Sequence, residues 1–123
     1  MVSFSAVAKR YPGGKSALEN VSFALEAGEM AFLTGRSGAG KSTLLKLIPA
    51  IERPSAGSVV INGQNVGALS RGAVPYLRRN IGLVFQDQKL LYDRNVFDNV
   101  MLPLAISGQP QAEAARRVRA ALD

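Results

Sequence analysis

One stretch of nine residues, Gly35 to Thr43, constrains the fold of this chain more than any other feature. It reads Gly-Arg-Ser-Gly-Ala-Gly-Lys-Ser-Thr and matches the pattern Gly-x-x-x-x-Gly-Lys-Ser/Thr. A short apolar run at 30–34 precedes it, and apolar residues at helical spacing follow from Lys41 to about Ile51. A glycine-rich loop between a buried strand and a helix is the setting in which this pattern binds phosphate, so the sequence predicts a phosphate-binding loop.

Each residue type in this loop has a physical reason to be there. Glycines at 35, 38 and 40 allow positive φ and keep Cβ atoms away from a ligand. Backbone N–H groups can then converge on phosphate oxygens, and the start of the helix adds partial positive charge. Lys41 is placed to reach the β- and γ-phosphates, Ser42 to offer a hydroxyl to Mg²⁺, and Thr43 to hold the α-phosphate side. The expected nucleotide-binding residues here are Gly35, Arg36, Ser37, Gly38, Ala39, Gly40, Lys41, Ser42 and Thr43.

Composition narrows the chemistry that can accompany phosphate binding. The 123 residues contain no cysteine and no histidine, which removes disulfides, thiolate metal sites and the commonest general base. A net charge of +6 suits phosphate in any form, whether nucleotide, nucleic acid or an anionic membrane face. Because residues 1–10 lack a signal peptide's apolar core and no apolar stretch reaches membrane-spanning length, we expect a cytoplasmic protein.

Hydrophobic periodicity predicts alternating strands and helices around the loop. We expect strands at 2–11, 17–25, 30–34, 58–61 and 81–85, with 30–34 and 81–85 buried on both faces. Helical segments are expected at 41–51, 74–79, 96–104 and 109–122. Pro49 should kink or end the first of these helices, and Pro103 should stop the third. The last segment has a basic face with Arg116, Arg117 and Arg119, which we interpret as a solvated face because no aromatic residues are interleaved with the arginines.

These features resemble a known family, the ABC-type ATPases. Leu83–Val84–Phe85–Gln86–Asp87, about 45 residues beyond Lys41, looks like the family's Q-loop. The resemblance implies that Gln86 reaches Mg²⁺ and the attacking water. It also places Tyr11 as the aromatic residue that stacks on adenine, so that ATP and Mg²⁺ are the expected ligands. Further segments at 28–35, 52–57, 74–79 and 93–100 are most similar to the branch of the family that acts in bacterial cell division.

The resemblance covers the whole chain but only the first half of such a domain. It implies an α/β fold, a P-loop NTPase core of the ABC ATPase type with an N-terminal antiparallel β subdomain, in which residues 1–123 form an incomplete nucleotide-binding domain. The last helix runs to Asp123 without a glycine or proline stop, so we expect the chain to be truncated before the signature motif and the Walker B strand. Leu69–Ser70–Arg71–Gly72 only imitates a signature. No catalytic residue is expected within these residues, because the Walker B glutamate and the switch histidine are missing.

The same resemblance implies the partners. The complete protein would pair with a transmembrane subunit, form a homodimer of nucleotide-binding domains, and lie peripherally at the cytoplasmic face of the inner membrane, without binding nucleic acid. Three alternatives stay open: the ATPase of a lipoprotein- or macrolide-type exporter, a P-loop kinase for a small molecule, and a non-catalytic nucleotide-binding product. Tyr11, the early antiparallel strands and Gln86 argue against the kinase.

Overall fold

Two long strands at the start of the chain form an antiparallel hairpin, β1 (Val2–Arg10) with β2 (Ser16–Leu25). The structure, a computed structural model, describes all residues 1–123 in two compact units, residues 1–77 and 78–123. The hairpin belongs to the first unit. Phe4 and Phe23 face each other across the strands with their rings stacked at 4.6 Å between centroids, a pairing that stabilises such a ladder.

A bulge in β1 changes which of its residues are buried. Loose alternation predicted a face of Val2, Phe4, Ala6 and Ala8, yet the buried pair is Phe4 and Val7. Ala6 has φ 48°, and the pairing register with both neighbouring strands shifts beyond Ser5. An extra residue in one strand moves every later side chain to the other face. The predicted strand is therefore confirmed, and its predicted inner face is wrong beyond the bulge.

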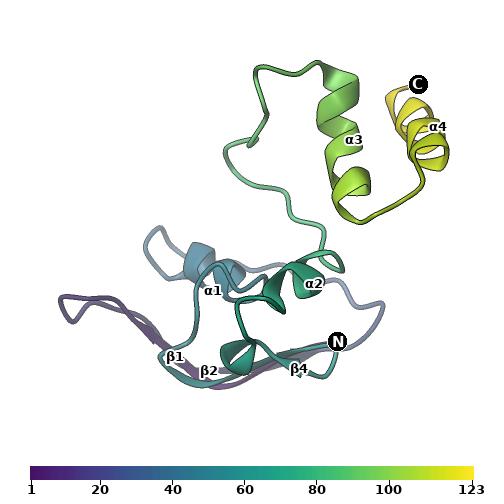
Figure 1. The fold of residues 1–123 in the computed structure, drawn as a ribbon. Helices are drawn as coiled ribbons and strands as arrows, with labels where there is room; N and C mark the ends of the chain where they lie inside the picture. Colours follow the sequence, from purple (N-terminus) through teal and green to yellow (C-terminus); the bar gives the residue numbers. More distant parts are fainter. The chain divides into compact units, whose positions relative to one another are not determined.

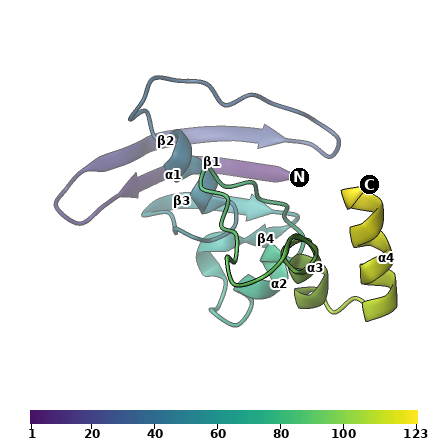
Figure 2. The ribbon, with the colours of Figure 1, turned by 90° about the horizontal axis from the view of Figure 1, so that it is seen from above.

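The sheet continues on the other side of β1 with β3 (Ala56–Ile61) and the short β4 (Gln64–Asn65), giving the order β2-β1-β3-β4 with every pair antiparallel (Figure 2). Asn62 and Gly63 both have positive φ, which is the geometry of the tight hairpin turn expected from an Asn-Gly pair. The antiparallel β subdomain is thus confirmed. The 3₁₀ turn η1 (Val66–Ala68) and the short helix α2 (Val74–Arg78) follow, the latter where a helical turn was predicted.

Helix α1 (Lys41–Leu47) follows the glycine-rich loop and lies over one face of this sheet (Figure 1). Leu44 and Leu47 are its buried residues, and they join Phe4, Val7, Leu18, Val59, Ile61 and Val66 in the core of the unit. The apolar spacing predicted a helix as far as Ile51, but the helix ends four residues earlier. Pro49 supplies the reason, because it cannot donate to a carbonyl one turn back, and it is fully buried instead.

Two predicted strands are absent. Residues 30–34 and 81–85 have no regular secondary structure, and their apolar side chains face solvent: Phe32 is 89% exposed and Val84 fully so. An apolar run forms a strand only where a neighbouring strand completes its ladder of hydrogen bonds and covers its side chains. Neither run pairs with another segment among residues 1–123, so both strand predictions are wrong for this structure.

The second unit carries two helices, α3 (Val96–Ile106) and α4 (Gln111–Leu122), which pack side by side (Figure 1). Ala114 and Val118 are the buried residues of α4. Helix α3 was expected to stop near Pro103, but it includes that proline and ends at Ile106. The Asn95 side chain caps its start by accepting the amide of Asp98, and Gly108 and Gln109 donate to Ala105 and Leu104 at its end. These end contacts stabilise the helix on both sides of the proline.

Candidate functional site: a phosphate loop beside Tyr11

The loop from Gly35 to Gly40 joins the 30–34 segment to α1, and its backbone depends on two glycines with positive φ. Gly38 has φ 82° and Gly40 has φ 96°. A Cβ atom on Gly40 would collide with the carbonyl oxygen of Ala17 and lie 2.8 Å from the Leu18 side chain. Gly35 does not use the positive φ that glycine allows. It is instead a packing position, where a Cβ would approach the Ala39 methyl to 3.3 Å.

Gly40 also forms the start of α1. It occupies the N-cap without a side-chain cap, and its carbonyl accepts the amide of Leu44 at 2.9 Å. The amide groups of the first helical turn have no intrahelical acceptor, as at any helix start. No side chain caps them here, and amide groups at a helix start can donate to an anion.

Lys41 folds back over this loop. Its Nζ donates to the carbonyl of Gly35 at 2.6 Å and to that of Arg36 at 2.8 Å. The ammonium therefore lies above the loop, at the solvent side, with its charge balanced only by backbone carbonyls. No carboxylate is paired with it among the ion pairs of the chain. A cation held in this way remains available to an incoming phosphate.

A cavity of about 460 Å³ opens beside the loop. Its lining combines the loop and α1 start with Tyr11 and the beginning of β2: Tyr11, Lys15, Ser16, Ala17, Ser37, Gly38, Gly40, Lys41, Ser42 and Thr43. The Tyr11 hydroxyl lies 3.3 Å from Oγ1 of Thr43, so Tyr11 is hydrogen-bonded to the first turn of α1, directly after the loop. Among the other predicted residues, Gly35, Arg36 and Ala39 belong to the loop backbone without lining the cavity.

The residues predicted for magnesium lie in different units. Ser42 is exposed at the cavity, where its hydroxyl fits Mg²⁺, an ion that takes oxygen ligands and keeps several waters. No group of three or more acidic side chains that could hold a metal ion is present. Gln86 belongs to the second unit, and its contact with the ion stays a prediction. Next to it, a hydrogen bond from Lys89 to Asp87 at 2.7 Å holds the pKa of that carboxyl below its usual value.

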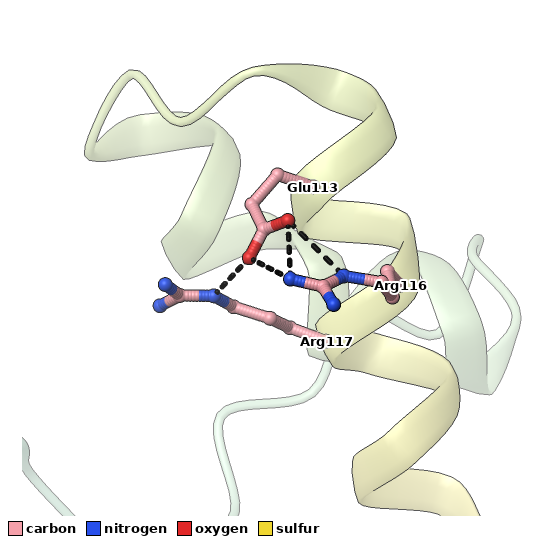
Figure 3. A network of polar contacts seen from close by, with 3 residues as sticks. All are labelled: Glu113, Arg116 and Arg117. Carbon is pink, nitrogen blue, oxygen red and sulfur yellow. Dashed lines mark hydrogen bonds and ion pairs between the residues drawn. The ribbon is translucent and has the colours of Figure 1, made fainter.

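The basic face of α4 is partly neutralised by its own helix. Figure 3 shows Glu113 accepting hydrogen bonds from both Arg116 and Arg117, with ion-pair distances of 2.8 and 3.0 Å. The Arg117 and Arg116 guanidinium groups lower the pKa of the Glu113 carboxyl. Arg119 instead lies over the Phe97 ring of α3. This arrangement supports the interpretation of a solvated helix face.

Sequence reasoning missed the β2 side of the cavity. Lys15, Ser16 and Ala17 belong to no phosphate-binding pattern, and they reach the site only because the β1–β2 hairpin folds over the loop. The signal that could have found them is the close spacing between Tyr11 and the second strand. Tyr11 closes that hairpin, donating its amide to the carbonyl of Lys15 at 2.9 Å.

Comparison with known proteins places the chain in a family. The family described as ABC transporter matches residues 18–123, and the chain belongs to it. The ABC ATPase fold predicted from the sequence is thus confirmed. None of the helices combines the length and the hydrophobicity that a membrane-spanning helix requires.

Several relatives are similar over the whole chain. The Cell division ATP-binding protein FtsE of Escherichia coli strain K12 is 56% identical over 123 residues, and that of Haemophilus influenzae is 48% identical. The Methionine import ATP-binding protein MetN of Rhizobium meliloti is 46% identical over 99% of the chain. The 123 residues span 55% of the length of the first of these relatives and 36% of the last.

Solved structures agree with the fold. The ATP-binding cassette MJ0796, in a dimeric post-hydrolysis state bound to ADP and Pi, superposes with a TM-score of 0.87 at 33% identity and covers 96% of this chain and 54% of that one. The cbiO1 protein of Clostridium perfringens, part of the ABC transporter complex cbiONQ, gives a TM-score of 0.83 at 29% identity over 98% of this chain and 48% of its own.

Proposed function

We propose that residues 1–123 are part of a single nucleotide-binding domain that binds ATP with Mg²⁺ for a membrane-associated ABC complex of bacterial cell division. The observation that supports ATP binding most strongly is that one cavity is lined by both Tyr11 and the loop residues Gly38, Gly40 and Lys41. Phosphates would lie on the loop and first turn of α1, and the base on Tyr11. Stacking of a base on an aromatic ring contributes about 1–3 kcal/mol and tolerates different bases.

The cell-division assignment rests on similarity along the chain. The cell-division relative of E. coli shares 56% of residues, against 46% for the methionine import relative. We therefore propose an FtsE-like protein whose transmembrane partner is FtsX-like. It would work as a homodimer of nucleotide-binding domains, peripheral to the cytoplasmic face of the inner membrane, and would not bind nucleic acid. Since the methionine import relatives are also close, an import ATPase is the second candidate.

A chimera tests the two candidates against each other. Residues 1–123 would replace the aligned part of FtsE in E. coli cells that lack their own, and of MetN in Rhizobium cells. We expect the first chimera to restore normal cell length and its Lys41→Ala version to fail, because division would need nucleotide held by this loop. Restored methionine import together with unrestored division would contradict the cell-division assignment and favour the second candidate.

ATP hydrolysis is proposed for the domain of full length and not for these residues alone. The 123 residues contain no histidine and no apolar run ending in Asp-Glu, so no group is placed to polarise an attacking water. Phosphate release should therefore be absent from the 123-residue chain and present in the FtsE chimera at equal concentration. Turnover by the 123-residue chain that disappears in Lys41→Ala would show that this expectation is wrong.

A further inference from the structure

Lys9, near the end of β1, is a nearly buried cation in contact with the nucleotide-site tyrosine. Its Nζ lies 5.2 Å from the centroid of the Tyr11 ring. The same ammonium is 3.1 Å from Oε2 of Glu52 and donates to the carbonyl of Arg53 at 2.8 Å. Only 13% of the Lys9 side chain is exposed, whereas lysine is rarely buried unless its charge is compensated. Both compensating groups come from the turn after α1, and the ring of Tyr11 is the third neighbour.

Tyr11 is consequently held at two ends. Its hydroxyl lies 3.3 Å from Thr43 in α1, and its ring lies under the Lys9 ammonium. Tyr11 lines the cavity and Lys9 does not, so the cation contacts the ring without occupying space in the site. A cation over an aromatic face is an attractive contact that strengthens when water is excluded, as it largely is from Lys9.

The turn that holds Lys9 is itself anchored. The Arg53 guanidinium donates to the carbonyls of Gly67 at 3.1 Å and Leu69 at 2.6 Å. The Glu52 amide donates to the carbonyl of Lys46, in the last turn of α1. Hydrogen bonds to α1 and to residues 67 and 69 thus fix the backbone that carries Glu52 and the Arg53 carbonyl. These two groups therefore hold the Lys9 ammonium in a defined position.

We propose that Lys9 is a positioning residue for the nucleotide base: it fixes the Tyr11 ring in the orientation that stacks on the base before the nucleotide arrives. This inference rests on the proposed ATP binding. A ring that is already held in place loses less conformational entropy when a ligand binds to it. The affinity for the ligand is therefore higher than it would be for a freely rotating ring. The gain in affinity should depend only on the base and not on the phosphates, because Lys9 touches neither the loop nor Lys41.

Two ligands separate this role from a structural one. ATP uses the loop and Tyr11, whereas inorganic tripolyphosphate uses only the loop. Calorimetric titration of Lys9→Met should show ATP affinity lowered about three- to tenfold, the range expected for one partly desolvated cation–aromatic contact, with tripolyphosphate affinity unchanged. Lys9→Arg should retain most of the ATP affinity, because a guanidinium also binds an aromatic face. Lys46→Met, which removes the same charge from an exposed site on α1, should change neither affinity.

A double substitution tests whether the effect passes through the ring. In a Tyr11→Ala background, Lys9→Met should cause no further loss of ATP affinity. An equal loss for ATP and tripolyphosphate, or an undiminished effect of Lys9→Met without the ring, would overturn the positioning role. If neither ligand binds the unsubstituted chain, the proposed ATP binding itself fails, which is a distinguishable result.

A measurement on the unsubstituted chain keeps the test decisive if Lys9→Met does not fold. Because the Lys9 Nζ lies 5.2 Å from the centroid of the Tyr11 ring, the proton resonance of the methylene bonded to it should report on the stacking of a base. We expect this resonance to shift with ATP and to stay in place with tripolyphosphate. Loop amides that shift with ATP while the Lys9 resonance does not move would contradict the inference.

Discussion

Lys41→Ala is expected to abolish measurable ATP binding and to leave the fold unchanged. Hydrogen bonds to charged groups contribute about 1.5–3 kcal/mol each, and a loss of 2.7 kcal/mol lowers affinity about a hundredfold. The folded chain should survive because the Lys41 ammonium contacts only exposed backbone carbonyls of Gly35 and Arg36, which water can bind instead. Titration with a fluorescent ATP analogue measures the loss, and amide spectra check the fold.

Lys46→Ala is the matched control for this prediction. Lys46 lies on the same helix, is exposed, and carries the same charge, but its side chain does not line the cavity. Its substitution should leave affinity within about twofold. If Lys41→Ala binds ATP as tightly as the unsubstituted chain does, Lys41 does not belong to the binding site. If Lys41→Ala and Lys46→Ala lose the same ATP affinity, Lys41 acts only through general electrostatic attraction.

Gly40→Ala should cause the largest loss of stability among small changes in the site. The new methyl group would need φ near 96° and would press against the Ala17 carbonyl and the Leu18 side chain. Backbone strain of this kind costs about 1–3 kcal/mol, and overpacking against backbone adds about as much again. We expect the free energy of unfolding to fall by about 3 kcal/mol or more, measured by urea titration of amide resonances in β1 and β3.

Gly38→Ala separates the two causes. Gly38 also has positive φ, but a Cβ there would meet nothing within 4 Å. This variant should therefore show only the strain, about 1–2 kcal/mol. If both variants lose the same free energy of unfolding, the contact of Gly40 with β2 contributes nothing to stability. The close approach of the loop to the hairpin would then be contradicted.

The turn of the glycine-rich loop and the helix start after it were predictable because their determinants are local. Nine consecutive residues specify the turn, the cation and the hydroxyl, and neighbouring periodicity identifies the helix that follows. The β1–β2 hairpin and the Asn62–Gly63 turn were equally accessible, since alternation and turn residues act over short distances. By contrast, the bulge at Ala6 depends on pairing with two strands at once, which no single segment encodes.

Predictions failed where a segment depends on distant partners. The runs at 30–34 and 81–85 have the composition of buried strands, yet composition supplies no neighbouring strand for their hydrogen bonds. Pro103 was predicted to stop α3, but the helix continues to Ile106 and is capped at both ends. The role of Lys9 could not be predicted from the sequence either. Its partners at 52 and 53 lie far along the chain, and one lysine in a strand forms no motif.

The central claim, that the loop from Gly35 to Thr43 binds the phosphates of ATP beside Tyr11, is tested most directly by following backbone amide resonances of the 123-residue chain during titration with Mg²⁺ and ATP. The account predicts saturable shifts concentrated in the loop and first turn of α1, with ring resonances of Tyr11 shifting at the same ATP concentration. Shifts confined to the basic face of α4, or no saturable shift in the loop, would contradict it.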